Sequence, residues 1–361
     1  METTCSSGSC TRGDGAFEPA RGLLGGKEFS SALWKSVCPH RHDLSNSSLR
    51  YVPSLFVMDL RQLTALLAVA DHGSFSAAAR ALHTVQSNVS AHIARLEREV
   101  GSTMIDRSTG ELTEEGELVA ARARRIQSEL DAIVTDVAAM HDDVSGTVRL
   151  GMIGTTARWL APALMEAMAA QYPGVHLVVV DATTTSLLPQ LTGGRLDLAV
   201  VNLPVNDAEL TTHALFTEDT ILLTPGNHPL ADRTEIALTE LDQLPLLLEP
   251  QGTNFRDLLD QQAAAAGITL VARAEVDGMR LLASLAFQGF GATVVPASAA
   301  PRWLEGDWCR IRVNGLEGRS VGVARRRKGM PAAPTRALQS VMGAVVAAEA
   351  PHQPGITPHD Q

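Results

Sequence analysis

The sequence is poor in aromatic residues and in cysteine. Phe, Trp and Tyr together make up 4% of its 361 residues, so we expect cores built from Ala, Val and Leu. Three of the four cysteines, Cys5, Cys10 and Cys38, precede residue 58, and Cys309 lies in the body of the chain. This distribution excludes a disulfide framework, and the spacing of the first two cysteines fits no zinc pattern. We therefore predict no metal site.

The sequence also lacks the marks of a membrane protein, of a secreted protein and of common enzyme classes. No apolar run approaches the length of a membrane span, and residues 1–57 lack the apolar core of a secretion signal. A GxSxG nucleophile elbow, an HExxH zinc helix, a complete phosphate loop and a GxGxxG turn after a strand are all absent. We therefore predict no catalytic residues and no cofactor.

Charge and composition along the chain separate a long N-terminal extension from the rest. Residues 1–57 are rich in Ser, Gly and Arg and show no sustained period, so we expect them to be disordered or not translated, with Met58 as the true start. The net charge of −10 argues against a non-specific coat for nucleic acid. It leaves room for a DNA-reading domain on an acidic body.

The stretch from Gly73 to Gly101, GSFSAAARALHTVQSNVSAHIARLEREVG, predicts two short helices with a tight break between them. Ser74 is a good N-cap for the first helix. In the second helix, apolar residues recur at helical spacing and predict one buried stripe: Val89, Ile93, Leu96 and Val100. The other faces carry small polar and basic residues, which suit a DNA major groove. A surface helical hairpin is the alternative interpretation of this stretch.

Residues 58–117 resemble the winged helix-turn-helix of LysR-type transcriptional regulators. The resemblance is carried by MDLRQLTALLAVADHGSFSAAARALHTVQSNVSAHIARLEREVG and TMIDRSTGELTEEG, and the layout to about residue 346 fits the same family. It implies an effector-responsive regulator with a DNA-binding domain over residues 58–116. Together with the helix geometry, it implies DNA contacts from the recognition helix, its approach and the wing: Ser74, Thr84, Gln86, Ser87, Asn88, Ser90, His92, Arg95 and Arg107.

The chain departs from its relatives at several of the positions that carry charge. The wing reads RSTGEL over residues 107–112, which is shorter and less basic than usual, and Ala91 and Ala94 stand where relatives often carry Arg or Gln. Val85 replaces the usual Ser or Thr before Gln86. Because fewer basic side chains neutralise phosphates, we expect DNA binding to depend only weakly on salt.

Residues 117–146 are predicted to form a dimerisation helix and a hinge. Thr113 is placed to cap this helix, with acidic residues in its first turn. Apolar residues then recur at heptad spacing, which predicts a two-stranded helical pair: Val119, Ile126, Leu130, Ile133, Val137 and Met140. A helix packed on its own domain is the alternative interpretation. The hinge is expected at residues 144–146.

From residue 147 to residue 349, strands and helices alternate, which predicts two α/β units with parallel sheets. We expect subdomain I over about 147–219 and 320–349, and subdomain II over about 220–319. Strand-like stretches at the borders are placed to cross between them, and residues 350–361 are expected to be a disordered tail. Two such units resemble type II periplasmic binding proteins, which close on a ligand by hinge motion. The predicted fold class is therefore a multidomain α+β protein.

Hydroxyl-rich turns follow the predicted strands of both units. Ligands of open α/β sheets bind beyond the carboxyl ends of the strands, at helix N-termini, and the family resemblance implies an effector cleft at these turns. The predicted effector-binding residues are Thr155, Thr156, Thr184, Asn202, Thr253 and Gly278. Simple helix capping is the alternative for each Thr. Arg158, Arg256 and Arg280 could pair with the carboxylate of a small anion or polar acid.

Taken together, these patterns favour a LysR-type transcription regulator that binds double-stranded promoter DNA and is controlled by a small-molecule effector. We expect a homodimer, and a homotetramer built from it, with no membrane partner, in the cytoplasm at the nucleoid. The alternative is a solute-binding or small-acid enzyme module whose N-terminal helical domain serves assembly. That alternative needs a secretion signal or catalytic residues, and the sequence shows neither.

Overall fold

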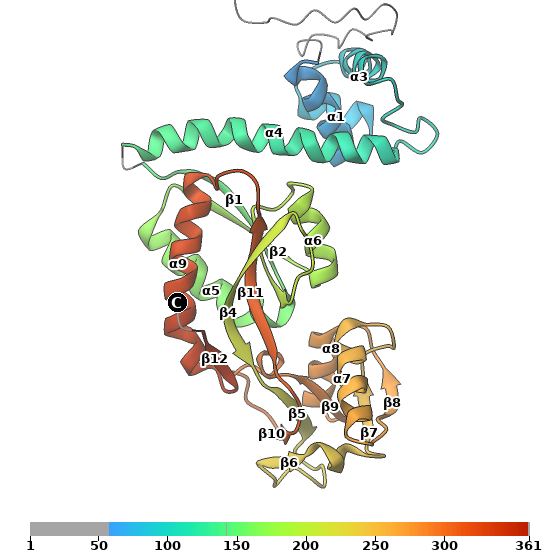
Figure 1. Ribbon diagram of the computed structural model, residues 1–361, viewed down its shortest axis with the longest axis vertical. Coiled ribbons are helices and arrows are strands. Elements are labelled where there is room, and N and C mark those ends of the chain that lie inside the picture. The colour runs from blue at the N-terminus through green and yellow to red at the C-terminus, as the bar shows by residue number, and fades with distance from the viewer. Residues whose placement is uncertain (1–57, 142, 360–361) are drawn as a thin grey trace, which may run out of the picture. The chain divides into compact units, whose positions relative to one another are not determined.

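The computed structural model describes residues 58–141 and 143–359 (Figure 1). The extension predicted over residues 1–57 lies outside these residues. The described chain starts with four helices, α1 (Leu60–His72), α2 (Phe75–Ala81), α3 (Gln86–Val100) and α4 (Glu114–Ala139). In the described residues no helix is both long and apolar enough to cross a membrane.

Capping residues set the ends of the first three helices. Asp59 and Gln62 form a reciprocal capping box at the start of α1, and the Ser74 hydroxyl accepts a hydrogen bond from Ala77 N at the start of α2. Gly73 and Gly101 end α1 and α3 with φ angles of 71° and 83°, a left-handed conformation that favours glycine. The predicted pair of helices with a tight break is thus confirmed.

A short wing follows α3 and leads into α4. Ile105 and Leu112 form an antiparallel β-bridge, and Met104 and Ile105 are buried in the helical core. The chain then passes close to itself at Gly116, where a Cβ would lie 2.0 Å from the Met104 carbonyl oxygen. Thr113 caps α4 through its hydroxyl, as predicted.

The α/β part contains two six-stranded sheets. The first has the order β12-β4-β11-β3-β1-β2, and the second has the order β6-β10-β5-β9-β7-β8. The strands of the first sheet are β1 (Gly146–Met152), β2 (Val175–Asp181), β3 (Leu198–Leu203), β4 (Leu210–Glu218), β11 (Arg319–Arg326) and β12 (Ile356–Pro358). Those of the second are β5 (Thr220–Pro225), β6 (Glu235–Ala237), β7 (Pro245–Leu248), β8 (Val271–Glu275), β9 (Ala292–Pro296) and β10 (Trp308–Asn314).

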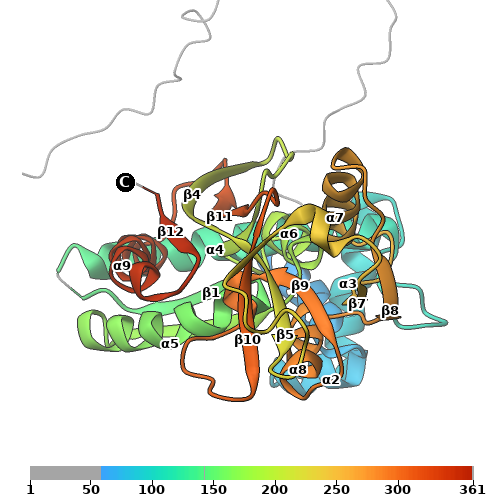
Figure 2. The same ribbon diagram turned by 90° about the horizontal axis from the view of Figure 1, so that it is seen from below.

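Helices cover both faces of each sheet. In the first sheet the connections from β1 to β2 and from β2 to β3 run in opposite directions, so right-handed crossovers place their helices on opposite faces. α5 (Gly154–Gln171) packs beside α9 (Ala333–Glu349), whereas α6 (Thr184–Thr192) packs against β3 and β1 (Figures 1 and 2). The second sheet repeats this arrangement with α7 (Asn254–Ala265) and α8 (Met279–Phe287).

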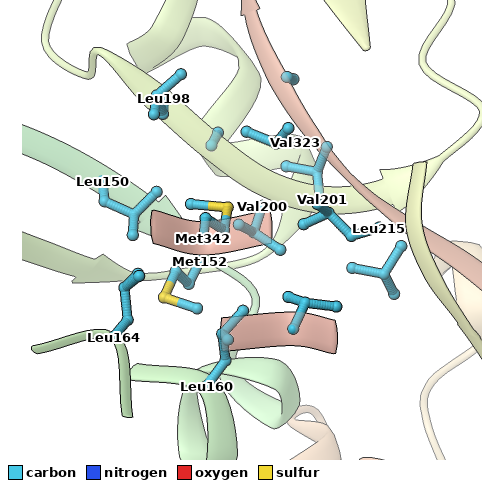
Figure 3. Close-up of a cluster of buried hydrophobic side chains, with 14 of the residues drawn as sticks. Leu150, Met152, Leu160, Leu164, Leu198, Val200, Val201, Leu215, Val323 and Met342 are labelled. Carbon is cyan, nitrogen blue, oxygen red and sulfur yellow. The ribbon is translucent and has the colours of Figure 1, made fainter. Parts of the chain in front are cut away.

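The core of the first sheet is aliphatic, as the scarcity of aromatic residues predicts. Leu150 and Met152 of β1 meet Val200 of β3, Leu160 of α5 and Met342 of α9 (Figure 3). The two buried aromatic rings of this core, Trp159 and Phe216, meet edge to face with ring centres 5.3 Å apart. This packing holds α5 against β4.

Two expectations about the sheets need correction. The sheets are mixed. In the first sheet β11 runs antiparallel to both of its neighbours, β3 and β4, and β12 runs antiparallel to β4, whereas β1, β2 and β3 are parallel. In the second sheet β5 runs antiparallel to β9 and β10. The disordered tail predicted for residues 350–361 is wrong for residues 350–359. Residues Ala350–His352 form a short 3-10 turn, and β12 pairs antiparallel with β4. Ile356, an isolated apolar residue in a polar segment, drives this pairing because it is only 6% exposed.

Candidate functional site

The face of α3 opposite its buried stripe offers a polar surface to solvent. Val89, Ile93 and Leu96 are fully buried against α1 and α2, which fixes the rotation of the helix. Val100, the fourth residue of the predicted stripe, is 38% exposed at the end of α3, so the prediction is wrong for this residue. This rotation leaves Gln86 and Ser87 exposed at the N-terminal end of the helix, with Asn88 beside them. Short hydrogen-bonding side chains at this end are the group that a recognition helix presents to base edges.

The residues predicted to contact DNA fall into two groups. Some have side chains exposed to solvent, and others already form hydrogen bonds within the helix-turn-helix. The Ser74 hydroxyl caps α2, and Asn88 Nδ2 donates to Thr84 Oγ1 at 3.0 Å across the turn. Gln86 Oε1 accepts from Ser76 Oγ at 3.3 Å, a contact between two exposed side chains. Ser90 and His92 are half-buried on the flanks of α3.

Two glutamates that the sequence reasoning passed over hold the basic residues of the domain. Arg95 Nε lies 2.9 Å from Glu99 Oε1, and Arg107 Nη2 lies 3.6 Å from Glu97 Oε2. Glu97 Oε1 also accepts a hydrogen bond from Met104 N, so it ties the wing to α3. The first pair has i, i+4 spacing on a helix and could have been read from the sequence. The second depends on the fold of the wing.

In subdomain I, the strand register gathers the predicted effector residues at one edge. Met152 and Asp181, the last residues of β1 and β2, are paired with each other, and Met152 also pairs with Val200 of β3, which continues to Leu203 at the same edge. The Thr184 hydroxyl accepts a hydrogen bond from Asn202 N at 3.1 Å, which joins the second turn to the third. The edge is thus built from three chain segments far apart in sequence.

Buried polar atoms at this edge are left without partners. Thr156 Oγ1 and Asn202 Oδ1 are buried and have no hydrogen-bond partner within the described residues. A buried polar atom without a partner costs about 1–3 kcal/mol, so such atoms in a native structure point to a bound group or water. Thr155 differs, because its hydroxyl accepts a hydrogen bond of 2.6 Å from Arg319 Nη2. Its role in the structure is to hold that arginine.

Subdomain II supplies the opposing turns. Thr253 precedes α7, but its hydroxyl bonds to Glu249 Oε2 at 3.3 Å and to the Pro250 carbonyl at 3.0 Å. Burial raises the pKa of the Glu249 carboxyl, and neighbouring Asp277 raises it further. Gly278 precedes α8 with a φ angle of 116°, a conformation strained for other residues, and so fixes where α8 begins.

An arginine pair and one aspartate occupy the space between the two subdomains. Arg280 of α8 reaches subdomain I, where its Nη1 lies 2.5 Å from Asp181 Oδ2. A Cβ on Gly154 would lie 2.8 Å from Asp181 Oδ1 and 3.0 Å from Arg280 Nε, so this ion pair lies across the N-terminus of α5. Arg158 Nη1 donates to the Ala299 carbonyl at 3.3 Å, and burial, together with Arg280, lowers its pKa.

The sequence reasoning named both arginines of this pair without placing them, and it missed Asp181. The prediction relied on hydroxyl-bearing side chains at strand ends, and an aspartate there does not fit that pattern. Arg256, the third arginine it named, is buried away from the pair, where it bonds to Asp260 and Glu275 and to the Glu249 carbonyl. It therefore has a structural role in subdomain II.

Two family models match the chain. "Bacterial regulatory helix-turn-helix protein, lysR family" covers residues 60–117, and "LysR substrate binding domain" covers residues 141–346. A probable hydrogen peroxide-inducible genes activator of Streptomyces viridosporus is 36% identical over 66% of this chain and 78% of its own length. One of Mycobacterium leprae is 31% identical over 80% of this chain and 94% of its own length.

Solved structures share the fold. A full-length cysteine variant of OxyR from Pseudomonas aeruginosa aligns with a TM-score of 0.68 at 24% identity, over 84% of this chain and 99% of that one. CbnR complexed with its target DNA aligns with a TM-score of 0.59 at 24% identity, over 81% of this chain and all of that one (100%).

The chain has a recognition helix in its N-terminal domain and a two-part α/β domain after it. It belongs to the LysR family of transcriptional regulators. It is a DNA-binding regulator with an effector-binding domain, and the predicted fold class is confirmed. Family membership favours the regulator over the solute-binding or enzyme module, because the named relatives are gene activators.

The division of labour on the DNA-binding domain is testable. Gln86 sits where side chains reach base edges, so Gln86→Ala should cost about 1–3 kcal/mol on a selected operator and relax sequence choice. Arg107 sits in the wing, so Arg107→Ala should weaken binding to any duplex and lower the salt slope by about one unit. Salt titrations on the operator and on a scrambled duplex measure both effects.

Arg98 serves as the control, since it is exposed near the end of α3 and outside the predicted contact set. Arg98→Gln should change neither sequence choice nor affinity by as much as the two variants above. Equal losses of Gln86→Ala on both duplexes would show that a different face of α3 enters the groove.

Proposed function

We propose that this regulator binds promoter DNA as a dimer, assembled further into a tetramer, and responds to a small polar acid bound between subdomains I and II. The observation that carries the effector proposal is the arginine pair Arg158 and Arg280 at a strand edge whose buried polar atoms lack partners. Because a regulator must reach chromosomal DNA, we also propose that this protein is located in the cytoplasm.

The charges between the subdomains define the effector's chemistry. Arg280 pairs with Asp181, whereas Arg158 donates to the Ala299 carbonyl, so an incoming carboxylate gains a charge-assisted partner in Arg158 without displacing Asp181. Asn202 Oδ1 is an acceptor without a donor, and Glu249 and Asp277 supply further acceptors from subdomain II. A small carboxylic acid that also carries a hydroxyl or ammonium donor satisfies both sets.

Thermal shift and calorimetric titration of the full chain against small carboxylic acids, with and without such a donor, test this proposal. Arg158→Gln and Arg280→Gln should each weaken binding of a stabilising acid about 10- to 100-fold, because a hydrogen bond to a charged group contributes about 1.5–3 kcal/mol. Arg302→Gln, an exposed arginine outside the cleft, is the control. Binding that survives both cleft substitutions would place the effector elsewhere.

The proposed dimer contact is the heptad face of α4. Small residues outside the heptad row pack this helix into the DNA-binding domain and beside the effector domain: Gly116, Ala120, Ala123 and Ala132. The heptad residues Ile126, Ile133 and Val137 are instead exposed, with Ile133 at 61%. An apolar row on a long helix is stabilised by a second copy of the same row, which would also set two reading helices on paired half-sites.

Substitutions on and beside the heptad row of α4 test whether this row forms the dimer contact. Ile133→Asp should abolish the dimer and high-affinity operator binding together, because a buried unpaired charge opposes association. Val134→Asp is the matched control, because Val134 is 70% exposed but lies one residue off the heptad row. Sedimentation velocity reports the oligomer. An intact dimer in Ile133→Asp would refute this contact.

The relatives named above raise hydrogen peroxide as an alternative signal. Cys309 is the one cysteine of residues 147–359, and it lies half-buried in β10. A disulfide needs two thiols with suitably placed Cα atoms, so this effector domain holds no disulfide switch within itself. We therefore propose that a bound ligand, and not an internal disulfide, changes the state of the domain.

Peroxide treatment of the full chain tests this distinction. Operator footprints before and after hydrogen peroxide should match, and Cys309→Ser should bind the operator with unchanged affinity. A footprint that peroxide alters in the natural chain but not in Cys309→Ser would show that this thiol is the sensor.

A further inference from the structure

The chain passes between the two sheets at two neighbouring crossings. The first joins β4, which ends at Glu218, to β5, which begins at Thr220. The second joins β10, which ends at Asn314, to β11, which begins at Arg319. Short connections between two sheets are where a hinge motion must occur, because the packed cores on either side move as units.

The C-terminal segment returns to the first crossing. In the β12–β4 pairing, Ile356 stands opposite Glu218, and Asp219 N donates to the Gly355 carbonyl at 2.8 Å. Ile356 is buried in the core of subdomain I. This segment lies beyond the region that the LysR substrate-binding model matches, which ends at residue 346.

The same segment also contacts subdomain II. Arg310 of β10 donates from Nη1 to the Pro354 carbonyl at 3.3 Å. Gly355 has a φ angle of 76°, and a Cβ there would lie 2.9 Å from the Cβ of Ala297. This short segment is therefore bonded to β4 through β12 on one side of the hinge, and it contacts β10 and the turn after β9 through Pro354 and Gly355 on the other.

The crossing that the segment covers is connected to the cleft. Glu218 is 1% exposed, its Oε2 accepts from Ser298 N of subdomain II at 3.0 Å, and its Oε1 pairs with Arg319. Arg319 continues to the Thr155 hydroxyl at the start of α5. A change in the crossing therefore reaches the N-terminus of α5 through two side chains.

We propose that residues 353–358, the C-terminal strap, form part of the hinge and restrict how far the two subdomains open. Because the strap contacts both sides, opening must break its contact with Ala297 and its bond to Arg310, or strip β12 from β4. The strap thus sets the resting angle of the effector domain. This proposal does not depend on the effector's identity or on its binding residues.

The angle is measurable by electron–electron resonance in the full chain with its four cysteines replaced by serine. Spin labels go on Ser340→Cys of α9 and Leu258→Cys of α7, both exposed, one in each subdomain. Labelled chain diluted into excess unlabelled chain leaves only distances within one protomer. Gly355→Ala adds a methyl group against Ala297. Gly267→Ala is the control, with a φ angle of 74° and open space around its Cβ.

The strap predicts that Gly355→Ala, and deletion of residues 353–361, shift or broaden the distance distribution, whereas Gly267→Ala reproduces the parent. Where the deletion lowers the melting transition, Gly355→Ala decides, because Gly355 and Gly267 have nearly the same φ angle, 76° and 74°. A folded deletion variant, or a folded Gly355→Ala, with the parent distribution would overturn the proposal.

Discussion

The effector domain depends on one buried ion pair, between Glu218 and Arg319. The Glu218 carboxylate sits at the crossing between the two sheets, where Nε and Nη2 of Arg319 both lie 2.5 Å from its Oε1. Burying two charges is costly unless further hydrogen bonds complete their shells, and here Ser298 N and the Thr155 hydroxyl do so. Removing one partner of such a pair typically costs about 3–5 kcal/mol. The crossing is therefore a polar contact in otherwise aliphatic surroundings, and it holds the two subdomains together.

This ion pair helps to position the strand ends where we propose that the effector binds. The parallel strands β1 and β2 end at one level, with β3 running three residues further, and α5 starts there, where Arg319 donates a hydrogen bond to Thr155. On the other side, α8 brings Arg280 to Asp181 across the start of α5. The Arg280–Asp181 ion pair thus links subdomains I and II at the place where a ligand would enter. A carboxylate that competes for Arg280 would therefore also weaken the contact between the subdomains. If the effector binds as proposed, one side chain would couple ligand binding to the hinge angle, as differential binding to two states requires.

The sequence was enough to predict the parts that depend on local patterns. The helices of the DNA-binding domain were predicted from the caps Ser74 and Thr113 and from the buried residues Val89, Ile93 and Leu96, because caps and helical spacing act within a few residues. Strand ends predicted the Thr and Asn turns of the cleft. Contacts between distant segments could not be predicted: Glu218 and Arg319 are 101 residues apart. The antiparallel strand β12 was missed because a single apolar residue, Ile356, between polar neighbours shows no period. The DNA contacts and effector residues remain predictions, since their partners are outside the chain.

The central claim is that an effector binds both subdomains at once, at the strand ends. Hydrogen exchange of the full chain, with and without a saturating carboxylic acid that stabilises it, tests this claim directly. Amides at the start of α5, near Gly154, and at the start of α8, near Gly278, should slow together, with the crossing at Asp219 changing in the same experiment. Protection of one subdomain alone, or protection confined to the DNA-binding helices, would contradict the account.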